Sequence, residues 1–261
     1  MMKIELRKSK DIKALAQSRL GQLDETPEGV TLFNETCSAI REAHGEAQLK
    51  EVDKFFKGLS LKQVKENEKY WETLTIDNDF DYFKRWMFAI MSVHTTWESN
   101  VYAYKVFAND FSWMATKERL AEMVREAKCG IHHRREVGFW QLAEKFRNDP
   151  TLFYKKNDET WIECRDRLIG EVFGLGIAKT TFALNLSFPM EAEVCCLDIH
   201  LLRFLGYIGE SPSVTDYKRL ENEWLIRCEK YGVSASVSRE IYWNKVQNRR
   251  NSRYWSYCIE K

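Results

Sequence analysis

The sequence predicts an all-α fold, and three observations support that prediction. The 261 residues include only four prolines and twelve glycines. Apolar side chains recur at the three- and four-residue spacing of a helix face, whereas the two-residue alternation of a strand is hard to find. The hydrophobic content of 44% and the nine tryptophans are enough for a sizeable core and exclude a disordered chain.

Helical spacing accounts for the first two-thirds of the chain. Residues 47–69 are typical of charge-rich amphipathic helices. A long apolar stripe between residues 82 and 107 predicts one buried helix and part of a second. Further helices are expected over residues 118–127, 134–146 and 159–173, and Asp158 is the expected N-cap of the last one.

The C-terminal third also predicts helices with recognisable ends. Ser213 is expected to cap a helix that Gly232 ends. The inward-facing positions of that helix are Val214, Tyr217, Leu220, Trp224 and Cys228. A final helix is expected over about residues 234–256, and it carries Arg249 and Arg250 among other basic side chains.

The charge balance and the cysteines limit the class of protein. Forty Lys and Arg against 39 Asp and Glu give a net charge of +1, which excludes a histone-like basic coat but leaves room for a local basic face. The seven cysteines include no CxxC pair and no spacing typical of zinc, so we expect reduced thiols and no bound metal. The N-terminus lacks the apolar core of a signal peptide, and no apolar run could span a bilayer. We expect a cytoplasmic monomer that does not bind membranes.

The segment 173–206, FGLGIAKTTFALNLSFPMEAEVCCLDIHLLRFLG, is the most informative part of the chain. A helix is expected to end at Phe173, before the turn Gly174-Leu175-Gly176 and a new helix from about Ala178. The first backbone N–H groups of such a helix have no partner within it. Together with the helix dipole they suit an anion such as a phosphate oxygen.

Asp198 stands alone in the apolar run that closes this segment. A carboxylate in such surroundings is unfavourable unless it is paired, exposed at a helix start, or used in chemistry. The simplest interpretation is an N-cap for a short helix over residues 199–205.

The order of these features resembles the helix-hairpin-helix superfamily of DNA glycosylases. The family signature pairs a Leu-Pro-Gly-Val-Gly hairpin with a Val-Asp-Thr-His-like motif, to which Cys196-Leu197-Asp198-Ile199-His200, followed by Arg203, is similar. Residues 83–96 and 130–135 resemble the family's early buried helix with its following loop and its Gly-aliphatic turn.

The resemblance covers residues 80–206 and implies a two-lobed, all-α fold, in which the hairpin and Asp198 face one cleft. Residues 1–261 would form a single glycosylase-like unit. Residues 1–79 and 207–261 would be helical additions that complete the second lobe.

The resemblance also implies an enzyme that binds double-stranded DNA, flips a modified or damaged base and cleaves its N-glycosidic bond. A carboxylate at position 198 would stabilise the positive charge that develops on the sugar. The implied catalytic residues are Asp198 and Lys179. The implied DNA contacts are Gly174, Gly176, Ile177, Lys179, Thr180, Arg134, Arg135, Arg249, Arg250 and His94, which takes the place of a residue that enters the duplex. The implied base pocket contains Trp86, Trp97, His132 and His200.

Two features depart from the family pattern. The hairpin lacks the proline, and its register leaves open whether Lys179 or Thr180 occupies the position of the catalytic lysine. Only Cys228 and Cys258 follow Asp198, so the family's C-terminal iron–sulfur cluster is not expected. A monovalent cation at the hairpin is the one cofactor that the resemblance allows.

Two other functions stay open. Gly-Leu-Gly-x-x-Lys and Cys-Leu-Asp-x-His also resemble a phage branch of this superfamily. Its members are thought to join an amino acid or polyamine to pyrophosphorylated 5-hydroxymethyluracil in DNA, which requires an amine cosubstrate. A DNA-binding helix-hairpin-helix protein without chemistry would explain the hairpin, but it would leave Asp198 without a purpose.

Overall fold

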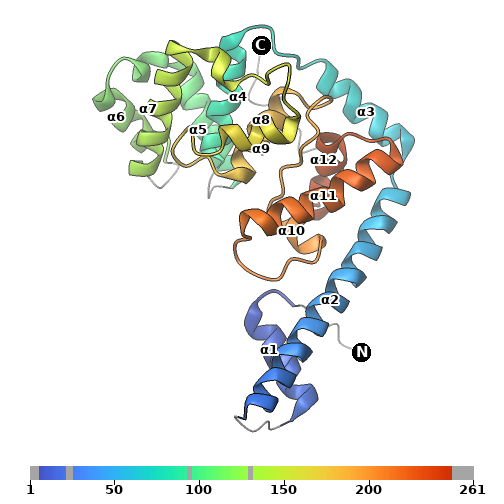
Figure 1. Ribbon diagram of the computed structural model, residues 1–261. Coiled ribbons are helices and arrows are strands. Elements are labelled where there is room, and N and C mark those ends of the chain that lie inside the picture. Colours follow the sequence, from blue (N-terminus) through green and yellow to red (C-terminus); the bar gives the residue numbers. More distant parts are fainter. Residues whose placement is uncertain (1–5, 22–25, 93–95, 129–131, 249–261) are drawn as a thin grey trace. The chain divides into compact units, whose positions relative to one another are not determined.

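All regular elements that the structure describes are helices, which confirms the all-α prediction (Figure 1). The structure is a computed structural model that describes residues 6–21, 26–92, 96–128 and 132–248, without the side chains of Trp97 and His132. Within these ranges, no helix is both long enough and apolar enough to cross a membrane.

The chain divides into two compact units, and each unit is built from two separate segments. Unit 1 contains Met1–Ser60 and Leu197–Gly232, and unit 2 contains Leu61–Cys196 and Val233–Lys261. The motif-bearing segment expected over residues 80–206 begins within unit 2 and ends within unit 1.

Unit 1 is organised by one long helix, α2. Its helices are α1 (Ser9–Leu20), α2 (Pro27–Lys57), α10 (Ile199–Phe204) and α11 (Val214–Tyr231). The other three all contact α2, and α1 lies alongside it (Figure 1). Near the N-terminal end of α2, a small apolar cluster contains Leu6, Ile12, Ala16, Cys37 and Ile40. Near its C-terminal end, Phe55 and Phe56 pack on Trp224 of α11, with ring centroids 5.8 and 4.8 Å apart. These contacts anchor α11 to α2.

A glycine pair brings α2 close to the turn that follows α10. Gly206 has a φ of +89°, and a Cβ atom placed on it would lie 2.9 Å from the Cα atom of Gly45. A side chain at position 206 would therefore meet both backbone strain and the backbone of α2.

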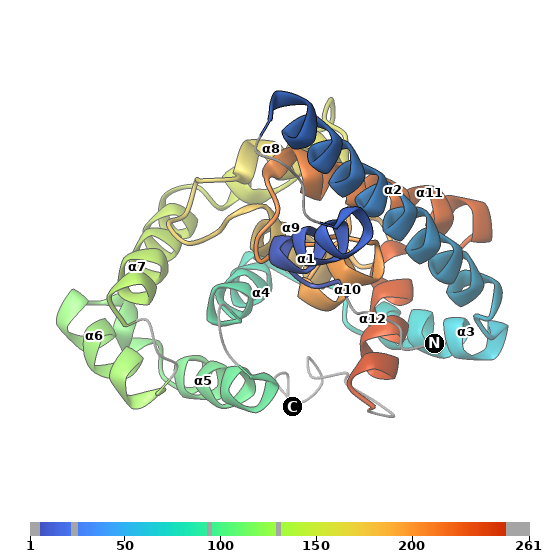
Figure 2. The same cartoon turned by 90° about the horizontal axis from the view of Figure 1, so that it is seen from below.

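Unit 2 is packed around α4. Its elements are α3 (Leu61–Glu72), α4 (Asp79–Met91), α5 (Trp97–Asn109), the 3-10 helix η1 (Phe111–Met114), α6 (Lys117–Glu126), α7 (His132–Asn148), the 3-10 helix η2 (Pro150–Phe153), α8 (Trp161–Leu168), α9 (Ile177–Ser187) and α12 (Ala235–Val246). Nine of the 13 residues of α4 are buried, because α5, α7 and α9 all contact it. The helices α6 and α7 lie side by side (Figure 2).

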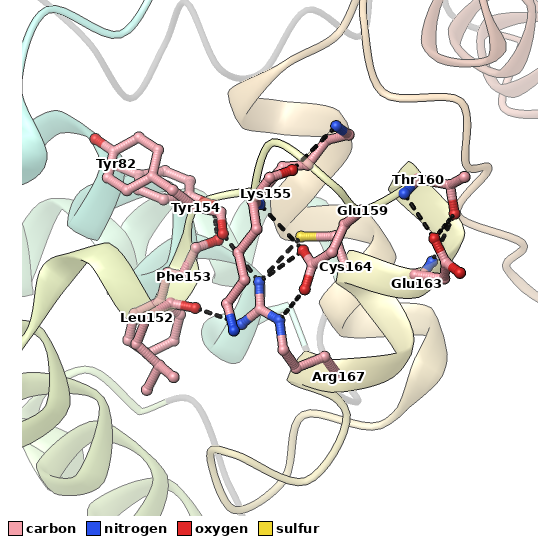
Figure 3. A network of polar contacts seen from close by, with 11 residues as sticks. Tyr82, Leu152, Phe153, Tyr154, Lys155, Glu159, Thr160, Glu163, Cys164 and Arg167 are labelled. Carbon is pink, nitrogen blue, oxygen red and sulfur yellow. Dashed lines mark hydrogen bonds and ion pairs between the residues drawn. The ribbon is translucent and has the colours of Figure 1, made fainter.

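A polar network ties α8 to the segment that precedes it (Figure 3). The guanidinium of Arg167 donates hydrogen bonds to the carbonyl oxygens of Leu152 and Tyr154, at 2.7 and 2.9 Å, and forms an ion pair with Glu159. The hydrogen bonds from Arg167 lower the pKa of the Glu159 carboxyl to about 2. Burial raises the pKa of the nearby Cys164 thiol to about 11. The network therefore holds a charged pair and two backbone carbonyls in one place.

Two predicted caps and one predicted helix break are confirmed in the C-terminal third. Asp198 and Ser213 each cap a helix, and Gly232 ends α11 in the left-handed conformation, with a φ of 62°. The final helix starts where predicted, with Ser234 as its N-cap, but it ends earlier than predicted. Val214 is an exception to the predicted inward face, because 52% of its surface is exposed. The final helix ends at Val246, and residues beyond 248 lie outside the described ranges.

The prediction for residues 159–173 is wrong at both ends. Thr160, not Asp158, caps α8, and Glu163 completes a capping box with it. The helix ends at Leu168 because Ile169 adopts an extended conformation and Gly170 has a φ of +86°. Residues 169–176 therefore form turns that lead into α9.

Candidate functional site

The hairpin before α9 is built on glycine conformations. Gly174 is exposed and has a φ of +86°, which an L-residue rarely adopts. The buried side chain of Leu175 anchors the turn, and its N–H group donates to the carbonyl oxygen of Val172 at 3.1 Å. Gly176 follows in an extended conformation and is the N-cap of α9.

The first turn of α9 has no side-chain cap, because Gly176 has no side chain. Among the described residues, no hydrogen bond is formed by the N–H groups of Gly176, Ile177 or Ala178. The carbonyl oxygen of Gly176 accepts hydrogen bonds from the N–H groups of Lys179 and Thr180, so the first helical turn of α9 is formed. Three successive donors at the positive end of a helix are a suitable site for an anion.

Two residues of the helix α7 contact this hairpin at Phe173. The side-chain oxygen of Gln141 accepts a hydrogen bond from the N–H of Phe173 at 2.8 Å. A Cβ atom on Gly138 would lie 2.6 Å from the carbonyl oxygen of Phe173, so only glycine fits there. Sequence reasoning missed both residues. A glycine inside a helical pattern was the available signal, since glycine weakens a helix unless a close approach requires it.

The side chain of Lys179 turns to the C-terminal end of α4. Its Nζ donates to the carbonyl oxygen of Ser92 at 2.9 Å and to the Ser92 hydroxyl at 2.8 Å. It also lies 5.5 Å from the centre of the Phe182 ring. Thr180 is fully buried, and its hydroxyl faces the carbonyl of Leu175 at 3.4 Å. Of the two candidates for the lysine position, Lys179 is partly exposed and Thr180 is fully buried.

Asn185 of α9 holds the extended segment that leads to the acid motif. Its amide group donates to the carbonyl of Val194 at 2.7 Å and accepts from the N–H of Cys196 at 2.9 Å. Arg239 of α12 donates to the carbonyl of Cys196 at 2.7 Å. Both residues were missed by the sequence reasoning, because polar groups that bond to a distant backbone follow no periodic pattern.

Asp198 lies at the start of the second segment of unit 1 and directly precedes α10. Its Oδ1 atom accepts hydrogen bonds from the N–H groups of His200 and Leu201, both at 2.9 Å. No hydrogen bond among the described residues uses its Oδ2 atom. The preceding Leu197 is buried, and its N–H donates to the hydroxyl of Tyr217 at 2.8 Å. The predicted cap is confirmed, and one carboxylate oxygen remains for another role.

Two predicted contact residues lie in the core of unit 2. Trp86 is fully buried and packs edge-on against Phe153, with ring centroids 4.9 Å apart, so its ring has no free face for a base. Arg135 is 3% exposed and donates to the carbonyl of Met91 at 2.7 Å, so its guanidinium supports α4 instead of meeting a phosphate. Both assignments are corrected by burial, because each side chain is enclosed by other residues of the protein.

The remaining predicted residues are only partly described. Arg134 is exposed and His200 is partly buried. His94, Arg249 and Arg250 lie outside the described ranges, and the side chains of Trp97 and His132 are not described. Within the described ranges, no three His, Cys, Asp or Glu side chains are grouped as metal ligands.

Comparisons with known proteins identify the fold. No protein-family model matches the sequence, and no curated protein is significantly similar to it. The structure is similar to the 8-oxoguanine DNA glycosylase of Thermotoga maritima, with a TM-score of 0.64 and 18% identity over 78% of this chain and 100% of the other. It is also similar to the 8-oxoguanine DNA glycosylase of Methanocaldococcus jannaschii, with a TM-score of 0.62 and 15% identity over 80% of this chain and 98% of the other.

A third similar structure contains DNA. It is the M. jannaschii 8-oxoguanine glycosylase/lyase in complex with a 15mer DNA that contains 8-oxoguanine, with a TM-score of 0.62 and 17% identity over 79% of this chain and 98% of the other. The helix-hairpin-helix glycosylase fold inferred from the motifs is therefore confirmed. Because nearly all of each neighbour is covered, the unmatched part of this chain is additional to their fold.

Proposed function

We propose that this protein is a DNA glycosylase that removes a modified or damaged base from double-stranded DNA. The observation that carries the proposal is the uncapped start of α9, in a fold shared with glycosylases. Three N–H groups at Gly176, Ile177 and Ala178 are available there, and Gly138 and Gln141 hold the turn that presents them. A phosphate oxygen of the DNA backbone is the anion that fits such a site.

Binding through this hairpin would involve few charges. The exposed Arg134 at the start of α7 is a further candidate for a phosphate contact. The net charge of +1 provides no large basic field. Affinity would therefore fall with salt at a slope set by a handful of phosphate contacts.

The chemical role belongs to Asp198. Breaking an N-glycosidic bond builds positive charge on the sugar, and a fixed carboxylate lowers the free energy of that transition state. The Oδ1 atom holds the carboxylate in place through the cap of α10, which leaves Oδ2 for the reaction. A water oxygen would bond to C1′, the bond from C1′ to the base nitrogen would break, and the base would leave with a proton.

The first substrate to test is 8-oxoguanine, because it is the base in the printed names of the similar structures. Duplexes that carry 8-oxoguanine, other oxidised bases or 5-hydroxymethyluracil would be incubated with the protein, and nucleosides and free bases would then be weighed by mass spectrometry. We expect a free base and an abasic site with the unmodified protein, and far less of both with Asp198→Asn. Intact DNA that becomes heavier when an amine is added would contradict the proposal and indicate base modification.

A further inference from the structure

The C-terminal end of α4 holds two cationic side chains from other helices. The carbonyl of Met91 accepts from Arg135 of α7, and the carbonyl of Ser92 accepts from Lys179 of α9. The last carbonyls of a helix lack partners within it and lie at the negative end of its dipole. This end of α4 is therefore a favourable place for positive charge.

Ser92 adds a second acceptor for Lys179. The hydroxyl of Ser92 donates to the carbonyl of Ala89 at 2.7 Å, so its proton is occupied and its oxygen faces Lys179 as an acceptor, 2.8 Å from Nζ. The backbone N–H of Ser92 bonds to carbonyls in the last turn of α4, which fixes the residue as the C-cap. Two oxygen acceptors on a single residue thus hold the amine.

We infer that Ser92 is a positioning residue that holds Lys179 as an ammonium ion and so keeps its amine from attacking the sugar. An amine that donates hydrogen bonds to two oxygens at a helix C-terminus is stabilised in its protonated form, which has no lone pair for nucleophilic attack. This inference rests on the proposed glycosylase function only where it concerns the sugar. The state of the amine belongs to the DNA-free protein and can be measured there.

The first measurement does not require activity. The protein would be acetylated with a limiting amount of reagent, and the labelling rate of each lysine would be read by mass spectrometry. Lys62, whose side chain is 85% exposed, provides the internal reference. We expect Lys179 to react more slowly than Lys62 and about fivefold faster in Ser92→Ala, because a hydrogen bond to a charged group is lost. Ser92→Thr keeps the hydroxyl and should restore the slow rate.

A matched control separates this effect from loss of any serine. Ser187 lies at the end of α9, and its hydroxyl donates to the carbonyl of Ala183, so Ser187→Ala removes a similar local bond without touching Lys179. Its Lys179 labelling rate should equal that of the unmodified protein. Equal labelling of Lys179 in the unmodified protein and Ser92→Ala would overturn the inference.

The second measurement uses DNA. With a duplex that contains an abasic site, a free amine adds to the C1′ aldehyde, water leaves, and borohydride reduces the resulting imine to a stable secondary amine. We expect more covalent adduct with Ser92→Ala than with the unmodified protein, and none with Ser92→Ala combined with Lys179→Gln. Lys179 could instead be labelled faster in Ser92→Ala without forming more adduct. Ser92 would then still hold the amine, but Lys179 would lie too far from the sugar to attack it. That outcome would overturn the part of the inference that concerns attack on the sugar, and not the contact with Ser92.

Discussion

The two helices that follow the hairpin and the acid motif begin in opposite ways. At α10 the carboxylate of Asp198 accepts hydrogen bonds from two backbone N–H groups. At α9 the N-cap is Gly176, which has no side chain, and among the described residues three N–H groups remain without a bond. Both helix starts have backbone donors without a partner inside the helix. The Asp198 side chain pairs with them at α10, whereas at α9 no side chain does so among the described residues.

The length and burial of the two helices explain why both solutions are stable. Eight of the 11 residues of α9 are buried, so tertiary packing offsets the missing cap. The helix α10 has only six residues and cannot rely on packing to the same extent, so it needs its cap. Asp198 therefore has a structural role as well as the proposed chemical one, and experiments must separate the two.

Asparagine and alanine at position 198 separate capping from chemistry, and here we expect the largest effect. Asp198→Asn should reduce turnover by about 10²–10³-fold, because the charge that stabilises the transition state is lost. Its unfolding free energy should change by less than about 0.5 kcal/mol, since Asn caps as well as Asp, whereas Asp198→Ala should lose about 1 kcal/mol. Base-release assays and urea denaturation measure the two effects. Full activity in Asp198→Asn would leave Asp198 as a cap only.

Loss of Arg167 tests the packing of unit 2 on which α9 depends. Arg167→Gln should lower the unfolding free energy by about 2 kcal/mol at pH 7, because Glu159 and two carbonyls lose a charged donor. The folded pKa of Glu159, about 2, lies below its ordinary value of 4.5. The stabilisation is therefore present above about pH 4.5 and is lost as the pH falls toward 2.

Urea denaturation at pH 7 and pH 3 measures this difference between the two proteins. The exposed ion pair of Arg219 and Asp216 in unit 1, with N and O atoms 3.9 Å apart, is the matched control. Arg219→Gln should change stability by less than about 0.5 kcal/mol at either pH. A difference for Arg167→Gln that is the same at both pH values would show that the ion pair with Glu159 is not its source.

Alanine at position 138 tests whether stability and DNA binding depend on the close approach of α7 to the hairpin. Gly138→Ala should destabilise the protein by about 1 kcal/mol or more, because its Cβ would lie 2.6 Å from the carbonyl oxygen of Phe173. Displacement of the turn should also weaken DNA binding. Gly45→Ala is the matched control in another helix, since no atom lies within 4 Å of its added Cβ, and it should be neutral or stabilising. Equal stabilities for the two variants would contradict the close approach.

Giving α9 an acidic N-cap like that of α10 is the most direct test of the difference between the two helix starts. It also has the smallest expected effect on stability. Gly176→Asp places a carboxylate at an extended N-cap whose added Cβ meets nothing within 4 Å. Stability should rise by a few tenths of a kcal/mol. Affinity for duplex DNA, measured by fluorescence anisotropy, should fall by about tenfold because the donors are occupied and a negative charge faces phosphate.

The neutral variant Gly176→Ser separates the effect of occupied N–H donors from the effect of the added negative charge. Its hydroxyl can cap α9 without adding charge, so its affinity should lie between those of Gly176→Asp and the unmodified protein. Unchanged DNA affinity in both variants would exclude the start of α9 as the phosphate site.

Local features of the fold were predictable from the sequence alone. Helical periodicity, the caps at Asp198 and Ser213, and the break at Gly232 depend on groups within four residues of each other. The ordered pattern of residues 173–206 also pointed to the glycosylase fold that the structural comparisons confirm. Each of these signals consists of residues that are close together in the sequence, so it can be recognised without knowing how the helices pack.

Only the tertiary structure decided which side chains of the candidate site are available. Arg135 and Trp86 are buried by partners 44 and more than 60 residues away, on other helices. Lys179 meets Ser92 across 87 residues, and the hairpin depends on Gly138 and Gln141 of α7. A side chain's exposure and hydrogen-bond partners depend on which distant segments fold against it, and a single sequence carries no local pattern for that.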